Sequence, residues 1–163
     1  MNWTAGSVRR MQMPAAVMAI MLLACSHPPP VPPAAASPVC APGDQAAAVK
    51  AIVGMYAALK IDSLDGFHAV TTPDFYAFER GVRLNGDELV QMVFGLHTQG
   101  KRIDWSVTQP TVHLDCKLAI VTYTNVGAIG TATAMQPVSW LESAELVYTA
   151  GAWRVRFFHS TRT

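Results

Sequence analysis

The sequence predicts an α+β domain in which helices precede a meander of strands. Up to residue 100, apolar residues recur at the spacing of amphipathic helices, whereas from Lys101 onward apolar and polar residues alternate with a period of two. The stretch from Ser139 to Ser160 predicts two strands joined by a tight turn at Gly151, a residue that accepts a positive φ without steric cost. Helices followed by a run of strands are typical of an α+β fold.

The composition indicates one domain with an N-terminal extension. The chain has 163 residues and a net charge of +1, and 51% of its residues are hydrophobic whereas only 14% are charged. The sequence contains no cluster of basic residues and no ladder of aromatic residues, so we expect no nucleic-acid partner.

Residues 1–24 have the layout of a secretory signal peptide. Arg9 and Arg10 form its positive end, and the apolar core that follows is shorter than the about 20 residues that a membrane span needs. The segment ends in Leu22-Leu23-Ala24-Cys25, which resembles the lipobox of bacterial lipoproteins, where the cysteine is acylated and becomes the new N-terminus. We therefore expect lipidation of Cys25 and an extracytoplasmic location, lipid-anchored in the bacterial cell envelope. An ordinary cleaved signal peptide is the alternative.

Residues 25–43 are expected to link this anchor to a folded domain at residues 44–163. Proline fixes φ and donates no backbone hydrogen bond, so the run rich in Pro and Ala from His27 to Pro42 predicts an extended, semi-rigid spacer. A proline-rich recognition ligand is the alternative function of this run.

Two further cysteines, Cys40 and Cys116, form one possible disulfide pair if Cys25 is lipidated. Disulfides persist outside the cytoplasm, and a bridge here would close a loop of about 75 residues. In the chain-entropy model such a loop stabilises the folded state by roughly 4 kcal/mol. The sequence does not show whether the two Cα atoms approach closely enough, so the pairing stays open.

Three helices are predicted in the first half of the domain. The first, Gln45 to Lys60, follows the candidate N-cap Asp44 and carries an apolar stripe expected to face the core. The members of this stripe are Val49, Ile52, Val53, Tyr56 and Leu59. Ser63 is expected to cap a short second helix, and the third runs from Asp87 to Gln99 with acidic residues in its first turn.

The remaining segments predict strands. A short aromatic strand, Asp74 to Glu79, precedes a turn at Gly81, and the first long strand begins at Lys101. The next, Leu118 to Val126, is nearly all apolar or β-branched, as in a strand covered on both faces. Residues 127–137 predict a loop before the closing hairpin. On the last strand, alternation predicts one face made of Trp153, Val155, Phe157 and His159.

The order and spacing of several short motifs resemble the superfamily of nuclear transport factor 2 and the SnoaL-like polyketide cyclases. These motifs are Leu64-Asp65-Gly66-Phe67, Pro73-Asp74-Phe75-Tyr76 with Gly81, Asn85-Gly86 before Leu89, Trp105, and Gly151-Ala152-Trp153 before His159-Ser160. The resemblance covers about residues 44–160. It implies a strongly curved antiparallel sheet wrapped around three N-terminal helices, with a conical pocket inside. Domains of this superfamily often pair through the sheet, so a homodimer is a possible partner state.

The resemblance also implies candidate catalytic residues. Steroid isomerases of this superfamily place a tyrosine on the first helix, a carboxylate base on the short strand, and a protonated acid on a later strand. Tyr56 and Glu79 fall near the first two positions, and the third falls near Ser143, which is a weaker donor. Glu145 could replace Ser143 if burial raised its pKa. The alternative is that Tyr56 is a core residue and Glu79 an exposed charge.

The five histidines lack the spacing of a zinc site, so we expect no metal and no cofactor. The pocket wall is expected to include Trp105, Tyr123 and Trp153, with His159 near the mouth. Two functions remain open at this point. The first is an envelope-tethered module that binds a small apolar ligand or dimerises, without catalysis; the second is an isomerase or cyclase of the ketosteroid-isomerase kind, acting on a small apolar carbonyl compound.

Overall fold

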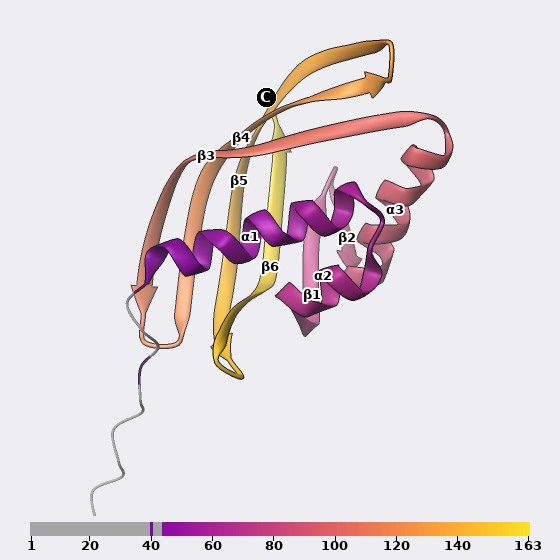
Figure 1. Ribbon diagram of the computed structural model, residues 1–163. Helices are drawn as coiled ribbons and strands as arrows, with labels where there is room; N and C mark the ends of the chain where they lie inside the picture. The colour runs from indigo at the N-terminus through magenta and orange to yellow at the C-terminus, as the bar shows by residue number, and fades with distance from the viewer. Residues whose placement is uncertain (1–39, 41–43) are drawn as a thin grey trace, which may run out of the picture. The chain divides into compact units, whose positions relative to one another are not determined.

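The computed structural model describes residue 40 and residues 44–163 of the chain (Figure 1). The predicted signal peptide, Cys25 and most of the predicted linker lie outside the described residues. The elements are α1 (Gln45–Lys60), α2 (Leu64–Val70), β1 (Thr71–Glu79), β2 (Val82–Asn85), α3 (Gly86–Thr98), β3 (Lys101–Asp115), β4 (Leu118–Thr131), β5 (Ala134–Thr149) and β6 (Ala152–Arg162). This order confirms the predicted α+β class.

The strands form one curved sheet in the order β2-β1-β6-β5-β4-β3. Neighbours are antiparallel except β1 and β6, which run parallel with Glu79 opposite Ser160. The predicted antiparallel sheet is therefore mixed, because β1 pairs with β2 on one side and, in parallel, with the last strand of the chain on the other. This pairing brings the end of β1 next to the end of β6.

Helix α1 lies across the concave face of the sheet (Figure 1). Its predicted cap is confirmed, since the Asp44 side chain accepts a hydrogen bond from the backbone N–H of Ala47 at 3.1 Å. Its buried face includes Ile52, Met55, Tyr56 and Leu59, whereas Val53 is 48% exposed. The prediction for Val53 was wrong because it stands about 100° around the helix from Ile52, outside the buried stripe.

The hairpin between β4 and β5 replaces the loop predicted at residues 127–137. Both strands continue to a two-residue turn after Thr131, and Gly127 pairs with Trp105 on one side and Val138 on the other. A Cβ atom on Gly127 would lie 1.9 Å from the carbonyl oxygen of Asp104. The small residues that predicted a loop instead permit close approach of neighbouring strands.

A β-bulge interrupts the alternation of β6. Leu146 pairs with Val155 and Glu145 with Phe157, so Arg156 is the extra residue. Beyond the bulge the two faces exchange, and Phe158 and Ser160 are buried while His159 is exposed. The predicted face that continued from Val155 to Phe157 and His159 was therefore wrong.

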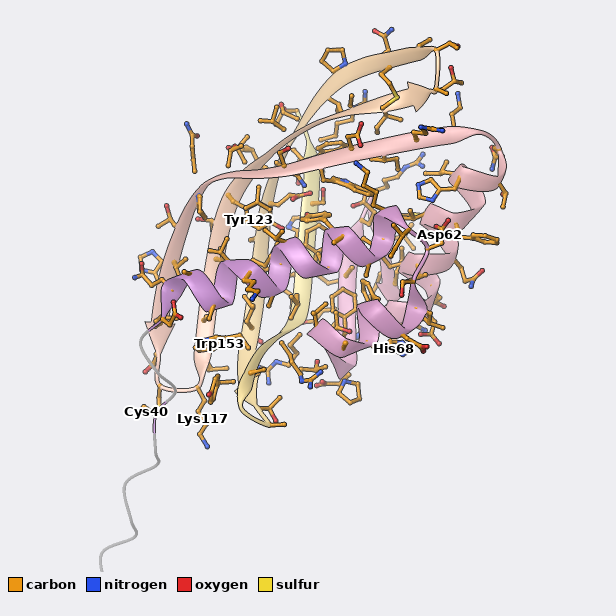
Figure 2. The ribbon with its side chains drawn as sticks, viewed as in Figure 1. Cys40, Asp62, His68, Lys117, Tyr123 and Trp153 are labelled. Carbon is orange, nitrogen blue, oxygen red and sulfur yellow. A yellow bond between two sulfur atoms is a disulfide. The ribbon has the colours of Figure 1, made fainter. Side chains whose placement is uncertain are left out.

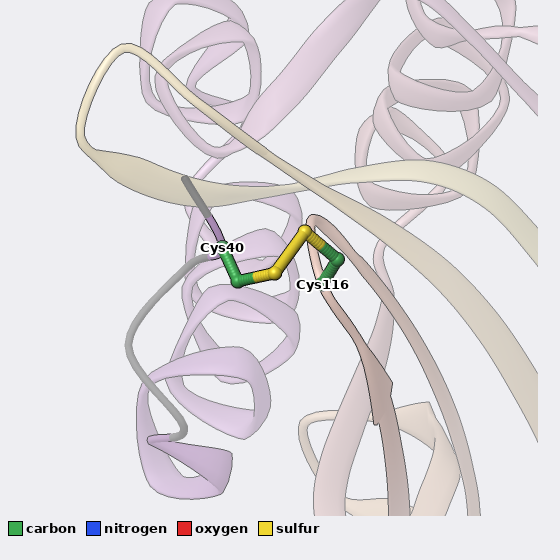
Figure 3. Close-up of a disulfide and its surroundings, with 2 residues drawn as sticks. All are labelled: Cys40 and Cys116. Carbon is green, nitrogen blue, oxygen red and sulfur yellow. A yellow bond between two sulfur atoms is a disulfide. The ribbon is translucent and has the colours of Figure 1, made fainter. Parts of the chain in front are cut away.

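A disulfide joins Cys40 to Cys116, with 4.4 Å between the Cα atoms and 76 positions between them in sequence (Figure 3). It connects the chain just before α1 to the turn between β3 and β4. None of the helices within residues 44–163 is both long and apolar enough to cross a membrane.

Candidate functional site

A cavity of about 330 Å³ lies between α1, α3 and the concave face of the sheet. Its walls are mainly apolar and include Leu89, Met92 and Val93 of α3 and Ile103, Trp105 and Trp140 of the sheet. Six polar side chains line it as well: Tyr56, Glu79, Arg80, Glu142, Ser160 and Arg162. An apolar pocket with a few convergent polar groups is the usual form of a small-molecule site.

The carboxyl group of Glu142 is the centre of a buried hydrogen-bond network. Its Oε2 atom accepts hydrogen bonds from the hydroxyl of Tyr56 and from the amide nitrogen of Asn125, the latter at 3.0 Å. Its Oε1 atom accepts one from Ser160 at 2.9 Å. The hydroxyl of Tyr123 lies 3.0 Å from that of Tyr56. Side chains from α1, β4 and β6 thus converge on one carboxyl group of β5, and Glu142 is 6% exposed.

Burial determines the protonation of this network. It raises the pKa of Glu142 above its ordinary value, although the hydrogen bonds from Tyr56, Asn125, Ser160 and Tyr123 act in the opposite direction. Burial likewise raises the pKa of Tyr56 and of Tyr123 well above that of a free tyrosine, and the charge of Glu142 adds to this. Both tyrosines therefore remain neutral hydroxyl donors, and the buried carboxyl takes up a proton more readily than an exposed one.

Glu79 is a second carboxyl group on the same cavity. It ends β1 and is partly buried, and burial followed by the charge of Glu142 raises its pKa. The charge of Arg80 and a hydrogen bond from Ser160 act to lower it. Ser160 thus interacts with both carboxyl groups. Two carboxyls that influence each other in an apolar cavity are the arrangement that proteins use for acid–base chemistry.

The structure brings together some of the residues singled out from the sequence. Tyr56, Glu79 and Trp105 line the cavity, and Tyr123 adjoins it through its hydrogen bond to Tyr56. The ring of Trp105 packs on that of Tyr56, with 5.4 Å between centroids.

Ser143 and Glu145 do not reach the cavity, which corrects the predicted position of the acid. The buried side chains of β5 alternate and include Glu142, Ala144 and Leu146, so Ser143 and Glu145 point to the outer face. There Glu145 forms an ion pair with Arg156 at 2.6 Å. The carboxyl group of β5 that lines the cavity, Glu142, stands one residue before the position that the resemblance implied. Alternation alone could have identified Glu142, because it is in phase with the apolar side chains of β5.

Trp153 and His159 are also outside the cavity. Trp153 is buried in the core, where its ring lies 5.4 Å from that of Tyr148, and it and Tyr123 lie on opposite sides of α1 (Figure 2). His159 faces outward beside the ring of Phe78, because the bulge at Arg156 turned it away from the interior. Neither residue can contact a ligand in the cavity.

The cone-shaped arrangement of sheet and helices defines a class of fold that solved structures share. No family model matches the sequence, and a search of curated proteins found no match either. A candidate dehydratase of the nuclear transport factor 2-like family from Streptomyces avermitilis is similar with a TM-score of 0.62 and 14% identity, over 72% of this chain and 94% of that one. A ketosteroid isomerase-like protein from Erwinia carotovora atroseptica is similar with a TM-score of 0.58 and 16% identity, over 72% of this chain and 94% of that one.

The CaMKII hub of S. rosetta is similar to the same extent, with a TM-score of 0.58 and 17% identity over 72% of this chain and 95% of that one. Proteins with different descriptions thus share this architecture. Residues 44–163 therefore have the nuclear transport factor 2-like fold, which confirms the predicted fold. Because such a fold hosts many functions, the function has to be argued from the cavity.

Proposed function

We propose that residues 44–163 bind a small, mainly apolar compound in the cavity and transfer a proton on it, as an isomerase or a dehydratase does. One observation carries the proposal: Glu79 and Glu142 face the same apolar cavity, and burial raises the pKa of both. Carboxyl groups with raised pKa values in a pocket are suited to general acid–base chemistry near neutral pH.

Glu79 is the base in this proposal because it is the less buried and less hydrogen-bonded of the two carboxyls. It removes a proton from a carbon beside a carbonyl group. The electrons of that C–H bond form the double bond of an enolate, whose charge rests on oxygen. Glu79 then returns the proton to another carbon of the conjugated system, so the base is restored and no redox partner is needed.

Tyr56 is the proposed donor to the enolate oxygen. In the substrate-free protein its hydroxyl donates to Glu142. When Glu142 is protonated, the carboxyl O–H can donate to the Tyr56 oxygen, and the Tyr56 proton is then available to the substrate. A neutral donor held by a protonated carboxyl in an apolar site stabilises developing negative charge effectively.

The test is hydrogen exchange at the carbon next to a carbonyl group. The purified full-length protein is incubated with 2-cyclohexenone in D₂O, and loss of the proton signals is followed by NMR. We expect catalysed exchange that Glu79→Gln abolishes with a melting temperature within about 2 °C of the unmodified chain. Glu145→Gln, the same change on the outer face, is the matched control and should retain exchange.

A binding module without catalysis is the second candidate, favoured by the observation that the Tyr56 hydroxyl already has two partners, Glu142 and Tyr123. Because these partners already meet the hydrogen-bonding needs of the Tyr56 hydroxyl, the network is stable without a substrate. Ligand-induced thermal stabilisation without catalysed exchange would support this candidate and exclude proton transfer by Glu79 on this substrate.

We also propose the arrangement of the whole protein. Residues 1–24 are a signal peptide, and residues 25–43 are a spacer that begins at a lipidated Cys25. The lipid holds the domain in the cell envelope. The Leu22-Leu23-Ala24-Cys25 motif supports this arrangement.

A homodimer through the sheet is supported by exposed apolar side chains on its outer face, Leu118, Ile120 and Leu141. Analytical ultracentrifugation of the protein and of Ile120→Asp tests it, since a dimer through this face should dissociate in the variant.

A further inference from the structure

Two arginines stand at the edge of the cavity. Arg80 follows Glu79 in the turn between β1 and β2, and Arg162 ends β6, two residues after Ser160. Both line the cavity and both are exposed to solvent. The ion pairs within residues 44–163 use other basic side chains, namely those of Lys60, His68, His97 and Arg156. The two guanidinium groups are thus available to a ligand.

The register of the sheet gives the order of groups from the floor of the cavity to its mouth. Glu142 pairs with Ser160, and one step farther along the same face Trp140 pairs with Arg162. Two residues of a strand span about 6–7 Å. A ligand lying along this face would therefore meet the hydroxyl and carboxyl groups of Ser160 and Glu142 at one end, and the indole of Trp140 beside the guanidinium group of Arg162 at the other end.

We infer that the cavity selects a small amphipathic carboxylate, whose acid group binds Arg80 and Arg162 at the mouth while its apolar body occupies the interior. This inference rests on the proposed function and narrows its substrate to a class: an apolar acid that carries a carbonyl or hydroxyl group at the end remote from the carboxylate. The guanidinium fork matches a carboxylate in two parallel hydrogen bonds, which makes arginine the side chain suited to this recognition.

The charges around the mouth are compatible with an anion. Glu79 is the acidic side chain of the lining nearest to Arg80 in sequence, and the mouth carries the two positive charges of Arg80 and Arg162 against this one carboxyl group. The other carboxyl, Glu142, lies at the floor, where it is engaged by Tyr56, Asn125 and Ser160. A carboxylate at the mouth therefore meets a net positive charge, while the uncharged end of the same molecule reaches the hydroxyl groups at the floor.

The test compares two probes of equal chain length, octanoate and octan-1-ol. Binding to the full-length protein is followed at pH 7 by tryptophan fluorescence, because Trp105 and Trp140 line the cavity. We expect octanoate to bind about tenfold more tightly than octanol, since one charged hydrogen-bond pair is worth at least about 1.4 kcal/mol. The double variant Arg80→Gln with Arg162→Gln should lose this preference and keep the affinity for octanol.

Arg83→Gln is the matched control. Arg83 lies outside the cavity, 4.4 Å above the ring of Tyr76, and its loss removes a charge nearby without altering the mouth. Equal affinity for the two probes in the unmodified protein would overturn the inference and leave the binding cavity standing. If Arg83→Gln lost the preference for octanoate over octanol to the same extent, the inference would be overturned too, because the net positive charge of the domain would then explain the preference. Failure of both probes to bind would overturn the proposed binding cavity as well.

Discussion

The hydroxyl of Tyr56 contributes directly to stability, and Tyr56→Phe measures that contribution. The change removes one oxygen atom and keeps the ring, which packs against Trp105 and Phe158. It removes a hydrogen bond to the buried carboxyl of Glu142 and leaves Tyr123 without its hydroxyl partner. Leaving a buried polar group unpaired costs about 1–3 kcal/mol, so we expect a loss of about 2 kcal/mol in the free energy of unfolding.

For a folded unit of about 120 residues, this loss corresponds to a fall of about 8 °C in melting temperature. The assay is thermal unfolding followed by circular dichroism at pH 7, with urea unfolding as the independent measure of free energy. Tyr148→Phe is the control, because the ring of Tyr148 packs edge to face against that of Trp153 and its hydroxyl forms no hydrogen bond within residues 44–163. We expect that variant to change the melting temperature by less than about 2 °C. Similar melting temperatures for the two variants would refute the view that the Glu142 network stabilises the fold.

Three further predictions follow from the structure and the sequence. The free energy of unfolding should fall as pH rises from about 4.5 through the raised pKa of Glu142, because over that range the native carboxyl keeps a proton that the unfolded chain has lost. Glu142→Gln should flatten this pH dependence in urea unfolding, and an unchanged slope would contradict the raised pKa of Glu142. Cys116→Ser should lower the free energy of unfolding by about 4 kcal/mol, and 1 mM dithiothreitol should destabilise the unmodified protein but not this variant. Mass spectrometry of the protein from bacterial membranes should find Cys25 as the first residue, carrying a diacylglyceryl group. The variant Cys25→Ser should be released from the membrane, and an unmodified N-terminus at another residue would exclude the lipid anchor.

Local features of the fold could be predicted from the sequence, because they depend on neighbouring residues. The caps at Asp44 and Ser63 and the bounds of α1 follow from side chains that bond to the backbone three residues on. The turn at Gly151 follows from its positive φ. These features need no knowledge of distant parts of the chain.

The features that were mispredicted depend on pairing between distant strands. The bulge at Arg156 lies in a strand that pairs with both β5 and β1, and its presence decides whether Ser160 or His159 faces the cavity. The close contact at Gly127 likewise depends on Asp104 of a neighbouring strand. The position that the resemblance implied, Ser143, is one residue from the carboxyl group that lines the cavity, Glu142, but in a strand one residue reverses the face.

The disulfide between Cys40 and Cys116 determines how a pull on the N-terminal part of the chain is carried into the domain. Tension applied ahead of Cys40 passes through the sulfur atoms to the turn between β3 and β4. Helix α1, which begins at Gln45, lies beyond that junction and is spared the load. Helix α1, which contributes to the cavity wall, is therefore shielded from such a pull, and the force spreads instead along a hairpin whose strands are paired continuously from Thr111 to Asp115.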